Sequence, residues 1–194
     1  MNAARRDHQL QTLARFLSML LRHRPARFPI ELDAQGYADL GQVMRILKAL
    51  PNFRWASRRD IQAVLDLEGA ERFELVATPD GDRIRALYGH TAVRPTYEPA
   101  EPPSVLYHGT APETLPAVER EGLQPMERRY VHLTVDPETA RRTGLRHAGD
   151  AVVLEIDAAA AHADGIPFYH PVEEIYLCDH IPPPYIRRKG SKAS

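Results

Sequence analysis

Three stretches in the first part of the chain carry apolar residues at helical spacing. The first, residues 7–22, gathers its leucines and a phenylalanine on one stripe. The second, residues 39–50, begins at Asp39, which is typical of a helix N-cap. The third follows Ser57-Arg-Arg-Asp60, a capping box with Asp in place of Glu, and Gly69 is suited to end it. The pattern predicts three consecutive helices.

Two short strand candidates follow, Arg72–Ala77 and Arg83–Tyr88. The turn sequence Pro79-Asp80-Gly81-Asp82 lies between them and predicts a hairpin. Three helices followed by a hairpin is the element order of a winged-helix module, a topology that often binds nucleic acid. We therefore expect residues 1–90 to form a winged-helix-like lobe.

Residues 91–103, TAVRPTYEPAEPP, contain four prolines and no periodic pattern, so we expect an extended linker between two domains. In residues 104–194 short strands alternate with short helices. The expected strands are Val105–Tyr107, Val131–Thr134, Ala151–Ile156 and Glu174–Leu177. One helix is expected from near Pro112, capped by Thr110, to Gly122, and another after Asp136-Pro137. The expected fold class is α+β.

Composition narrows the class of protein. The 194 residues are 43% hydrophobic and 26% charged, which is ordinary for a globular protein. No apolar run approaches the roughly 20 residues that span a bilayer, and the N-terminus lacks the apolar core of a secretory signal. A single cysteine, Cys178, excludes an internal disulfide framework and a cysteine-rich zinc site. We expect a cytoplasmic protein with no membrane contact.

The net charge of −1 divides unevenly along the chain. Residues 1–90 carry 14 Lys and Arg against 11 Asp and Glu, whereas residues 91–194 carry 11 against 15. Six arginines and one acid, Asp7, lie within the first 30 residues. Such a face could hold a polyanion, since guanidinium groups match phosphate oxygens. A solvated helix face is the alternative, and charge alone favours it.

Four clusters of residues are candidates for a functional site. Two of them have a histidine at the end of an expected helix or strand. Arg22-His23-Arg24-Pro25 closes the first helix, where cations are stabilised by the helix dipole, so a cationic cap and a functional site are both open. Tyr107-His108-Gly109-Thr110 turns from a strand into a helix. Its glycine would let a ligand approach the backbone and the helix N-terminus would favour an anion. A plain strand-to-helix turn is the alternative and is favoured in isolation.

The other two clusters lie later in the second half. In Arg128–Thr134, His132 and Thr134 share one strand face and could bind a ribose or a carboxamide, or face solvent at a sheet edge. In Gly144–Gly149, Arg146 and His147 suit a pyrophosphate, although a cationic helix cap would look the same.

Several common sites are not indicated. The histidines are dispersed, so no metal site is expected. The chain has no GxGxxG, no GxxxxGK[ST] and no GxSxG, which argues against a Rossmann site, a P-loop and a serine-nucleophile elbow. Glu173-Glu174 are neighbours in an expected strand and would point to opposite faces, so they do not form an acid/base pair.

Taken in order, these clusters resemble the RNA 2′-phosphotransferase family of KptA-type enzymes. The matching segments run from about Leu13 to Ile186 and are Phe16–Pro25, Arg72–Leu75, Arg83–His90, Leu106–Thr110, Arg128 with Val131–Thr134, Gly144–His147 and Asp164–Tyr169. Each segment is a weak signal, but the ordered series is specific.

The resemblance implies a winged-helix-like N-terminal lobe and a C-terminal ADP-ribosyltransferase-like lobe built on short strands that holds NAD⁺. In the family an RNA 2′-phosphate attacks C1″ of the nicotinamide riboside. The ribose O2″ then displaces the RNA hydroxyl and gives ADP-ribose 1″,2″-cyclic phosphate. NAD is consumed and no metal is needed. The expected partner is RNA bearing a 2′-phosphate, such as tRNA, and the expected oligomeric state is a monomer.

The resemblance also implies the site residues. The family's Arg-His-Arg-Arg set maps to Arg22, His23, Arg72 and Arg128. Arg85 and Arg129 remain rivals for the last two positions. The residues expected to bind NAD are His108, Gly109, Thr110, His132, Leu133, Thr134, Arg146 and His147. An apolar residue near Ile175, in what would be the last strand, is expected where ADP-ribosyltransferases carry a glutamate.

Two departures and two alternatives accompany this interpretation. The chain reads Ala70-Glu71-Arg72 where Lys-x-Arg is common in the family, and Arg146-His147-Ala148-Gly149 where Arg-His-Gly is common. One alternative function is an ADP-ribosyltransferase that modifies nucleic-acid terminal phosphates. The other is a non-catalytic winged-helix protein that senses NAD.

Overall fold

The chain divides into two compact units, Met1–Thr96 and Tyr97–Ser194. The computed structural model describes residues 3–23, 25–67, 72–146 and 149–189. The boundary at Thr96 and Tyr97 falls within the proline-rich stretch 91–103. Helices and antiparallel strands occur in both units, which confirms the α+β class.

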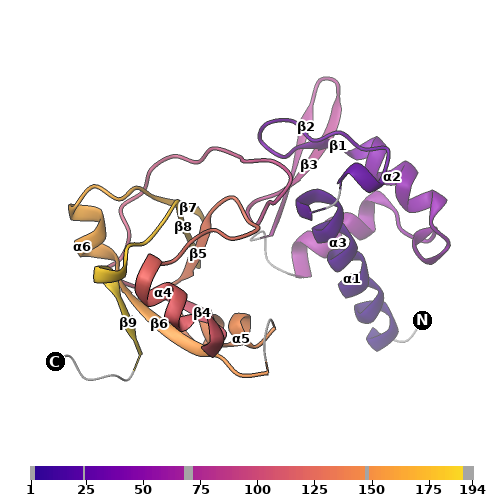
Figure 1. Ribbon diagram of the computed structural model, residues 1–194. Coiled ribbons are helices and arrows are strands. Elements are labelled where there is room, and N and C mark those ends of the chain that lie inside the picture. The colour runs from indigo at the N-terminus through magenta and orange to yellow at the C-terminus, as the bar shows by residue number, and fades with distance from the viewer. Residues whose placement is uncertain (1–2, 24, 68–71, 147–148, 190–194) are drawn as a thin grey trace. The chain divides into compact units, whose positions relative to one another are not determined.

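Unit 1 packs three helices against a small antiparallel sheet (Figure 1). Its helices are α1 (Ala3–Ser18), α2 (Leu40–Ala49) and α3 (Arg58–Leu67), with a π-helical turn at Met19–His23 and 3₁₀ turns at Pro25–Arg27 and Pro51–Phe53. Its strands are β1 (Ala38–Asp39), β2 (Phe73–Thr78) and β3 (Gly81–Ala86), in the order β1-β3-β2. The predicted helices and hairpin are confirmed, and Pro79 and Asp80 form the connection between Thr78 and Gly81.

The predicted caps form as the sequence indicates. The Asp39 carboxylate accepts from the backbone N–H of Gln42 at 2.8 Å. At α3, the carboxylate of Asp60 accepts from both the N–H and the hydroxyl of Ser57 at 2.7 Å. Gly69, the expected end of α3, lies outside the described residues. The apolar stripe of α1 is buried against α3, with Leu13 and Leu17 fully covered.

Asp60 also forms an ion pair with Arg6 of α1. Burial would raise the pKa of Asp60, but the hydrogen bonds from Arg6 and Ser57 outweigh burial and hold the pKa below its ordinary value. A carboxylate with a lowered pKa stabilises the fold above its unfolded-state pKa of about 4, and this contribution is lost as the pH falls through the folded-state value.

We expect Asp60→Asn to lower the free energy of unfolding by about 1–2 kcal/mol at pH 7, because the charged partner of Arg6 and part of the cap are lost. The difference from the unmodified protein should shrink below about pH 4. Urea unfolding at pH 7 and pH 3 measures it, with Asp66→Asn as control, since Asp66 lies exposed on the same helix. Equal losses at both pH values would contradict the role given to the charge.

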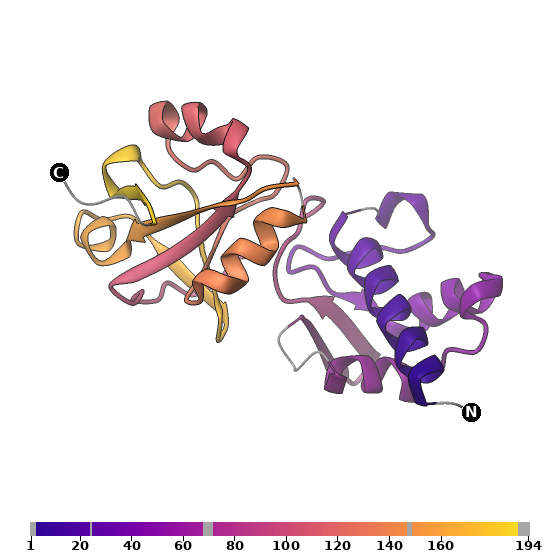
Figure 2. The same ribbon diagram turned by 90° about the horizontal axis from the view of Figure 1, so that it is seen from below.

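Unit 2 is built around a six-stranded antiparallel sheet in the order β7-β8-β5-β4-β6-β9. The strands are β4 (Val105–Thr110), β5 (Val131–Thr134), β6 (Val152–Asp157), β7 (Phe168–Val172), β8 (Ile175–Cys178) and β9 (Ile186–Arg188). The helices are α4 (Leu115–Glu121), α5 (Pro137–Leu145) and α6 (Ala158–Ala163), with 3₁₀ turns at Pro112–Thr114 and Pro183–Tyr185. Figure 2 shows α5 lying against the sheet.

The structure corrects several predictions in unit 2. Thr110 does not cap a helix but ends β4, and its hydroxyl contacts the hydroxyl of Thr114 at 2.7 Å. Glu173 and Glu174 form the turn between β7 and β8 rather than part of a strand. Ile175 belongs to β8, which is followed by β9 and is therefore not the last strand. The predicted helix end at Gly122 and the Asp136 cap are confirmed.

The pairing of β5 excludes one alternative left open by the sequence, that His132 and Thr134 lie at a sheet edge. β5 pairs with β8 on one side and β4 on the other, so its residues do not lie at a sheet edge. No helix among the described residues is long and apolar enough to cross a membrane.

Candidate active site

The predicted site residues divide between the two units. Arg22, His23 and Arg72 belong to unit 1, and Arg128 with the residues expected to bind NAD belongs to unit 2. Arg24 and His147 lie outside the described residues.

In unit 1, Arg22 and His23 lie in the π-helical turn that continues α1. Such turns are rare and occur frequently at functional sites. The guanidinium carbon of Arg22 lies 4.8 Å from the centre of the Tyr88 ring and 5.7 Å from that of Phe73. Aromatic rings at this distance attract a cation and restrict where it can move. The Arg22 guanidinium is therefore held in a defined place.

Arg72 lies beside Arg22. The Arg22 side chain donates to the backbone carbonyl of Arg72 at 3.4 Å, and the N–H of Leu87 donates to the same carbonyl at 3.0 Å. The structure thus brings the backbone of Arg72 to the side chain of Arg22, although the two residues are fifty positions apart in the sequence.

Arg85, the rival to Arg72, is engaged elsewhere in unit 1. Its Nε donates to the Glu74 carboxylate at 2.7 Å, and its guanidinium carbon lies 4.5 Å from the centre of the Tyr37 ring. Tyr37 donates its hydroxyl proton to the same carboxylate at 2.5 Å. The charge of Arg85 is therefore already compensated within this network.

The segment after β3 holds the π-helical turn in place. The backbone carbonyl of Arg22 accepts from the N–H of Thr91 at 2.9 Å and from that of Ala92 at 3.3 Å. The Thr91 hydroxyl lies 3.3 Å from the same carbonyl and 3.4 Å from Nδ1 of His23. These contacts satisfy a carbonyl that a helix end would otherwise leave without a donor.

His90, the residue before Thr91, is buried, with 2% of its surface exposed. Burial, together with the charges of Arg22, Arg85 and His23, lowers the pKa of His90 to about 4. The ring is therefore neutral at physiological pH. A side chain at Gly36, which has a φ of 81°, would meet Nε2 of His90 at 2.7 Å, so the backbone of residue 36 packs directly on the imidazole.

In unit 2, His108 of β4 and His132 of β5 lie on neighbouring strands. Nδ1 of His108 donates to the carbonyl of His132, and Nδ1 of His132 donates to the carbonyl of Tyr130, each at 2.9 Å. A carbonyl can only accept, so the proton of each neutral ring lies on Nδ1 and Nε2 carries the lone pair. Such nitrogens accept hydrogen bonds from ribose hydroxyls or a carboxamide.

Gly109 has a packing role in unit 2. A Cβ at this position would lie 1.8 Å from the backbone carbonyl oxygen of Ala140 in α5. A Cβ at Gly144 would lie 3.1 Å from the backbone of Gly109 and Thr110. The two glycines therefore allow α5 to pack on β4, and α5, not a ligand, occupies the space beside Gly109. This packing fixes the strand that carries His108.

The remaining predicted residues lie in β5, in the turn before it and at the end of α5. Arg128 is half-buried in the turn that leads into β5, where its N–H donates to the carbonyl of Pro125, and Arg129 is exposed. Leu133 and Thr134 of β5 are buried. Arg146 is exposed and caps the C-terminus of α5.

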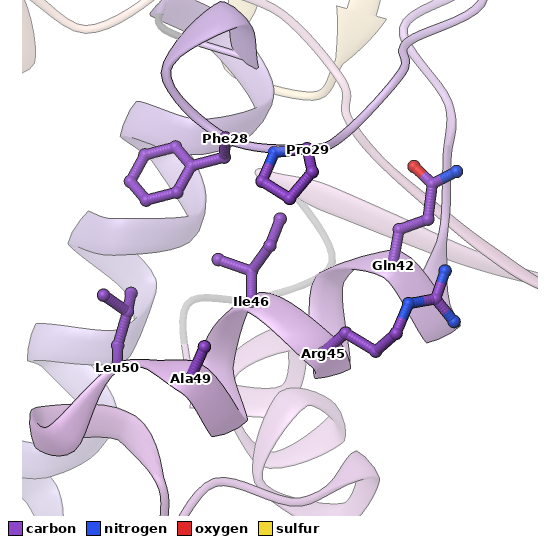
Figure 3. Close-up of a pocket in the computed structure, with 7 residues that line it drawn as sticks. All are labelled: Phe28, Pro29, Gln42, Arg45, Ile46, Ala49 and Leu50. Carbon is purple, nitrogen blue, oxygen red and sulfur yellow. The ribbon is translucent and has the colours of Figure 1, made fainter.

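A cavity of about 470 Å³ in unit 1 lies away from the predicted residues (Figure 3). It is lined by Phe28, Pro29, Gln42, Arg45, Ile46, Ala49 and Leu50. The walls are largely apolar and come from α2 and the segment after the π-helical turn.

Comparison with known proteins identifies the family. A family model described as RNA 2′-phosphotransferase, Tpt1 / KptA family, matches residues 7–180. The chain belongs to the RNA 2′-phosphotransferase family. The match covers both units, so each group of predicted residues lies within the RNA 2′-phosphotransferase homology.

Relatives in three bacteria carry the name probable RNA 2′-phosphotransferase. The protein of Acetivibrio thermocellus is 37% identical over 176 residues, which cover 90% of this chain and 94% of the relative. Those of Pseudomonas aeruginosa (strain UCBPP-PA14) and Streptomyces griseus are each 39% identical, over 180 and 184 residues, covering 92% of this chain and 96% of each relative. The resemblance inferred from the ordered motifs is confirmed.

Sequence reasoning missed the residues that support Arg22. Thr91 was assigned to the start of the proline-rich linker, although it directly follows the matched segment Arg83–His90. Tyr88 and Phe73 lie in the matched segments Arg83–His90 and Arg72–Leu75, but nothing in the sequence indicates that their rings contact Arg22. Among the described residues, no group of three or more His, Cys, Asp or Glu side chains is placed to hold a metal ion.

Proposed function

We propose that this protein is an NAD⁺-dependent RNA 2′-phosphotransferase that moves a 2′-phosphate from RNA to ADP-ribose. The observation that carries the proposal is that Arg22 and His23 lie in one π-helical turn of unit 1, with the Arg22 side chain bonded to the backbone of Arg72, in a chain of this family. A 2′-phosphate carries up to two negative charges, and arginines bind such a group through charge-assisted, often bidentate bonds.

Within this proposal each unit has its own part. Unit 1 is a winged-helix-like lobe that binds the RNA phosphate, which the order of three helices followed by the β2–β3 hairpin supports. Unit 2 is an ADP-ribosyltransferase-like lobe that binds NAD⁺ through His108, Thr110, His132 and Thr134. Its antiparallel sheet of short strands and the Nε2 acceptor of His108 support that assignment.

The second and third arginines of the site are Arg72 and Arg128. Arg85 is compensated by Glu74, which supports Arg72 as the phosphate ligand. Arg128 is half-buried beside the start of β5, whereas Arg129 is exposed, which supports Arg128 over Arg129 as the last residue of the Arg-His-Arg-Arg set.

The first step needs little acid/base chemistry, because the phosphate is already anionic. A phosphate oxygen forms a bond to C1″ as the bond to the nicotinamide nitrogen breaks, and the arginines position the nucleophile. In the second step O2″ attacks phosphorus and the bond to the RNA 2′ oxygen breaks. The RNA oxygen gains a proton and O2″ loses one, so the step benefits from a proton donor. We assign that donor to His23.

The test is a product assay with purified protein, NAD⁺ and a short RNA that carries one internal 2′-phosphate. We expect 2′-hydroxyl RNA, nicotinamide and ADP-ribose 1″,2″-cyclic phosphate in equal amounts, resolved by chromatography and mass. The same RNA with a 2′-hydroxyl serves as control and should release no nicotinamide. Stable ADP-ribosylated RNA without cyclic phosphate would instead identify an enzyme that stops after the first step, and no nicotinamide release would refute the proposal.

A further inference from the structure

The hydroxyl of Thr91 contacts both members of the Arg22–His23 pair. It lies 3.3 Å from the Arg22 carbonyl oxygen and 3.4 Å from Nδ1 of His23. Both contacts are long for hydrogen bonds, which is common for catalytic groups before a substrate binds. A single hydroxyl thus links the backbone of one predicted residue to the ring of the next.

The number of available protons determines how these contacts can be used. A hydroxyl has one proton to donate, and a carbonyl oxygen can only accept. A protonated His23 carries protons on both ring nitrogens, so its Nδ1 can only donate. Both contacts then exist together in one way alone: Nδ1 of His23 donates to the Thr91 oxygen, and the Thr91 proton goes to the Arg22 carbonyl.

The surroundings hold Thr91 in place. Its N–H donates to the Arg22 carbonyl at 2.9 Å, and the preceding residue, His90, is buried against Gly36. Gly89, before it, has a φ of 83°, which favours glycine, and a Cβ there would lie 3.5 Å from the Arg22 side chain. The hydroxyl is therefore presented by a fixed segment.

We propose that Thr91 is a positioning residue for the reaction: it holds Nδ1 of His23 as the protonated nitrogen, so that Nε2 is the atom that transfers the proton in the second step. Thr91 itself touches neither RNA nor NAD⁺ in this role. The inference rests on the proposed function, because it refines the part given there to His23.

The experiment compares Thr91→Val, which keeps the branched shape without the hydroxyl, with Thr91→Ser, which keeps the hydroxyl. We expect Thr91→Val to slow the second step by about 10-fold, the effect of one lost hydrogen bond. The first step should change little, so ADP-ribosylated RNA should accumulate in single-turnover assays. Thr91→Ser should restore the step ratio of the unmodified enzyme, which is the rate of the second step divided by the rate of the first.

Thr12→Val provides a matched control. The Thr12 hydroxyl donates to the carbonyl of His8 at 2.9 Å and accepts from Arg15 at 3.2 Å, the same bonding pattern on the exposed face of α1. It should leave the step ratio unchanged. Thermal unfolding of all three variants separates a local effect from a loss of fold.

A spectroscopic measurement tests the tautomer directly. Nitrogen-15 NMR of His23 above its pKa should show the proton on Nδ1 in the unmodified protein and a mixture of tautomers in Thr91→Val. A predominant Nε2–H tautomer in the unmodified protein would overturn the inference, as would an unchanged step ratio in a folded Thr91→Val protein. If the unmodified protein does not release 2′-hydroxyl RNA at all, the proposed function fails instead, and the NMR result still decides the tautomer.

Discussion

Replacing Arg22 with alanine is expected to reduce 2′-phosphate removal by a factor on the order of 1,000, the largest functional loss that we anticipate from one substitution. Arg22 is held between Tyr88 and Phe73 next to Arg72, so its charge is placed before the substrate arrives. A preorganised cation stabilises developing charge without the cost of reorganising solvent. Single-turnover kinetics with 2′-phosphorylated RNA measure the loss.

Two further variants sharpen this prediction. Arg22→Lys should remain strongly impaired, because an ammonium group cannot bind phosphate through a planar fork. Arg45→Ala is the matched control, since Arg45 belongs to the same unit but its side chain is 74% exposed and lies at the rim of the apolar cavity. Near-normal turnover of Arg22→Ala would remove Arg22 from the site, and an equal loss in Arg45→Ala would indicate a nonspecific effect of charge.

Gly109→Ala is expected to cause the largest loss of stability. The added Cβ would lie 1.8 Å from the Ala140 carbonyl oxygen, a backbone atom that no side-chain rotation can move. Overpacking of this kind costs about 3 kcal/mol, so the melting temperature should fall by about 6–12 °C. Because β4 also carries His108, NAD⁺ binding should weaken in parallel. Calorimetry and NAD⁺ titration measure the two effects.

Gly149→Ala is the control for this substitution. Gly149 follows α5 in the same unit, and a Cβ there would meet nothing within 4 Å. It should leave the melting temperature unchanged. A stable Gly109→Ala protein with normal NAD⁺ binding would show that α5 can move away from β4, contrary to the packing described for these two elements.

The three helices and the hairpin of unit 1 could be predicted because their signals are local, whereas the two-residue strand β1 was missed. Helical periodicity and caps at Asp39 and Ser57 act within a few residues, and the hairpin depends on its own turn. In unit 2 the two missed strands, β7 and β9, lie at the edges of the sheet, where pairing on one side suffices, and β7 contains Pro171. The alanine-rich α6 has no polar and apolar alternation to reveal it.

The site was predictable in part for the same reason. The motifs indicated which residue types could bind phosphate and NAD⁺, and the family was identified from their order. The packing of α5 on Gly109 could not be predicted from the sequence, because α5 lies about thirty residues further along the chain. Thr91 was missed because its role depends on Arg22, sixty-nine positions earlier. Contacts of this kind arise only when the chain folds.

The way the chain leaves unit 1 shields Arg22 from mechanical load. Thr91 and Ala92, which bond to the Arg22 carbonyl, stand shortly before Thr96, the final residue of the unit. Gln35 anchors Thr96 twice, accepting from its N–H at 3.2 Å and donating to its hydroxyl at 2.7 Å. Tension in the following segment therefore reaches the Gln35 anchor before it reaches Arg22.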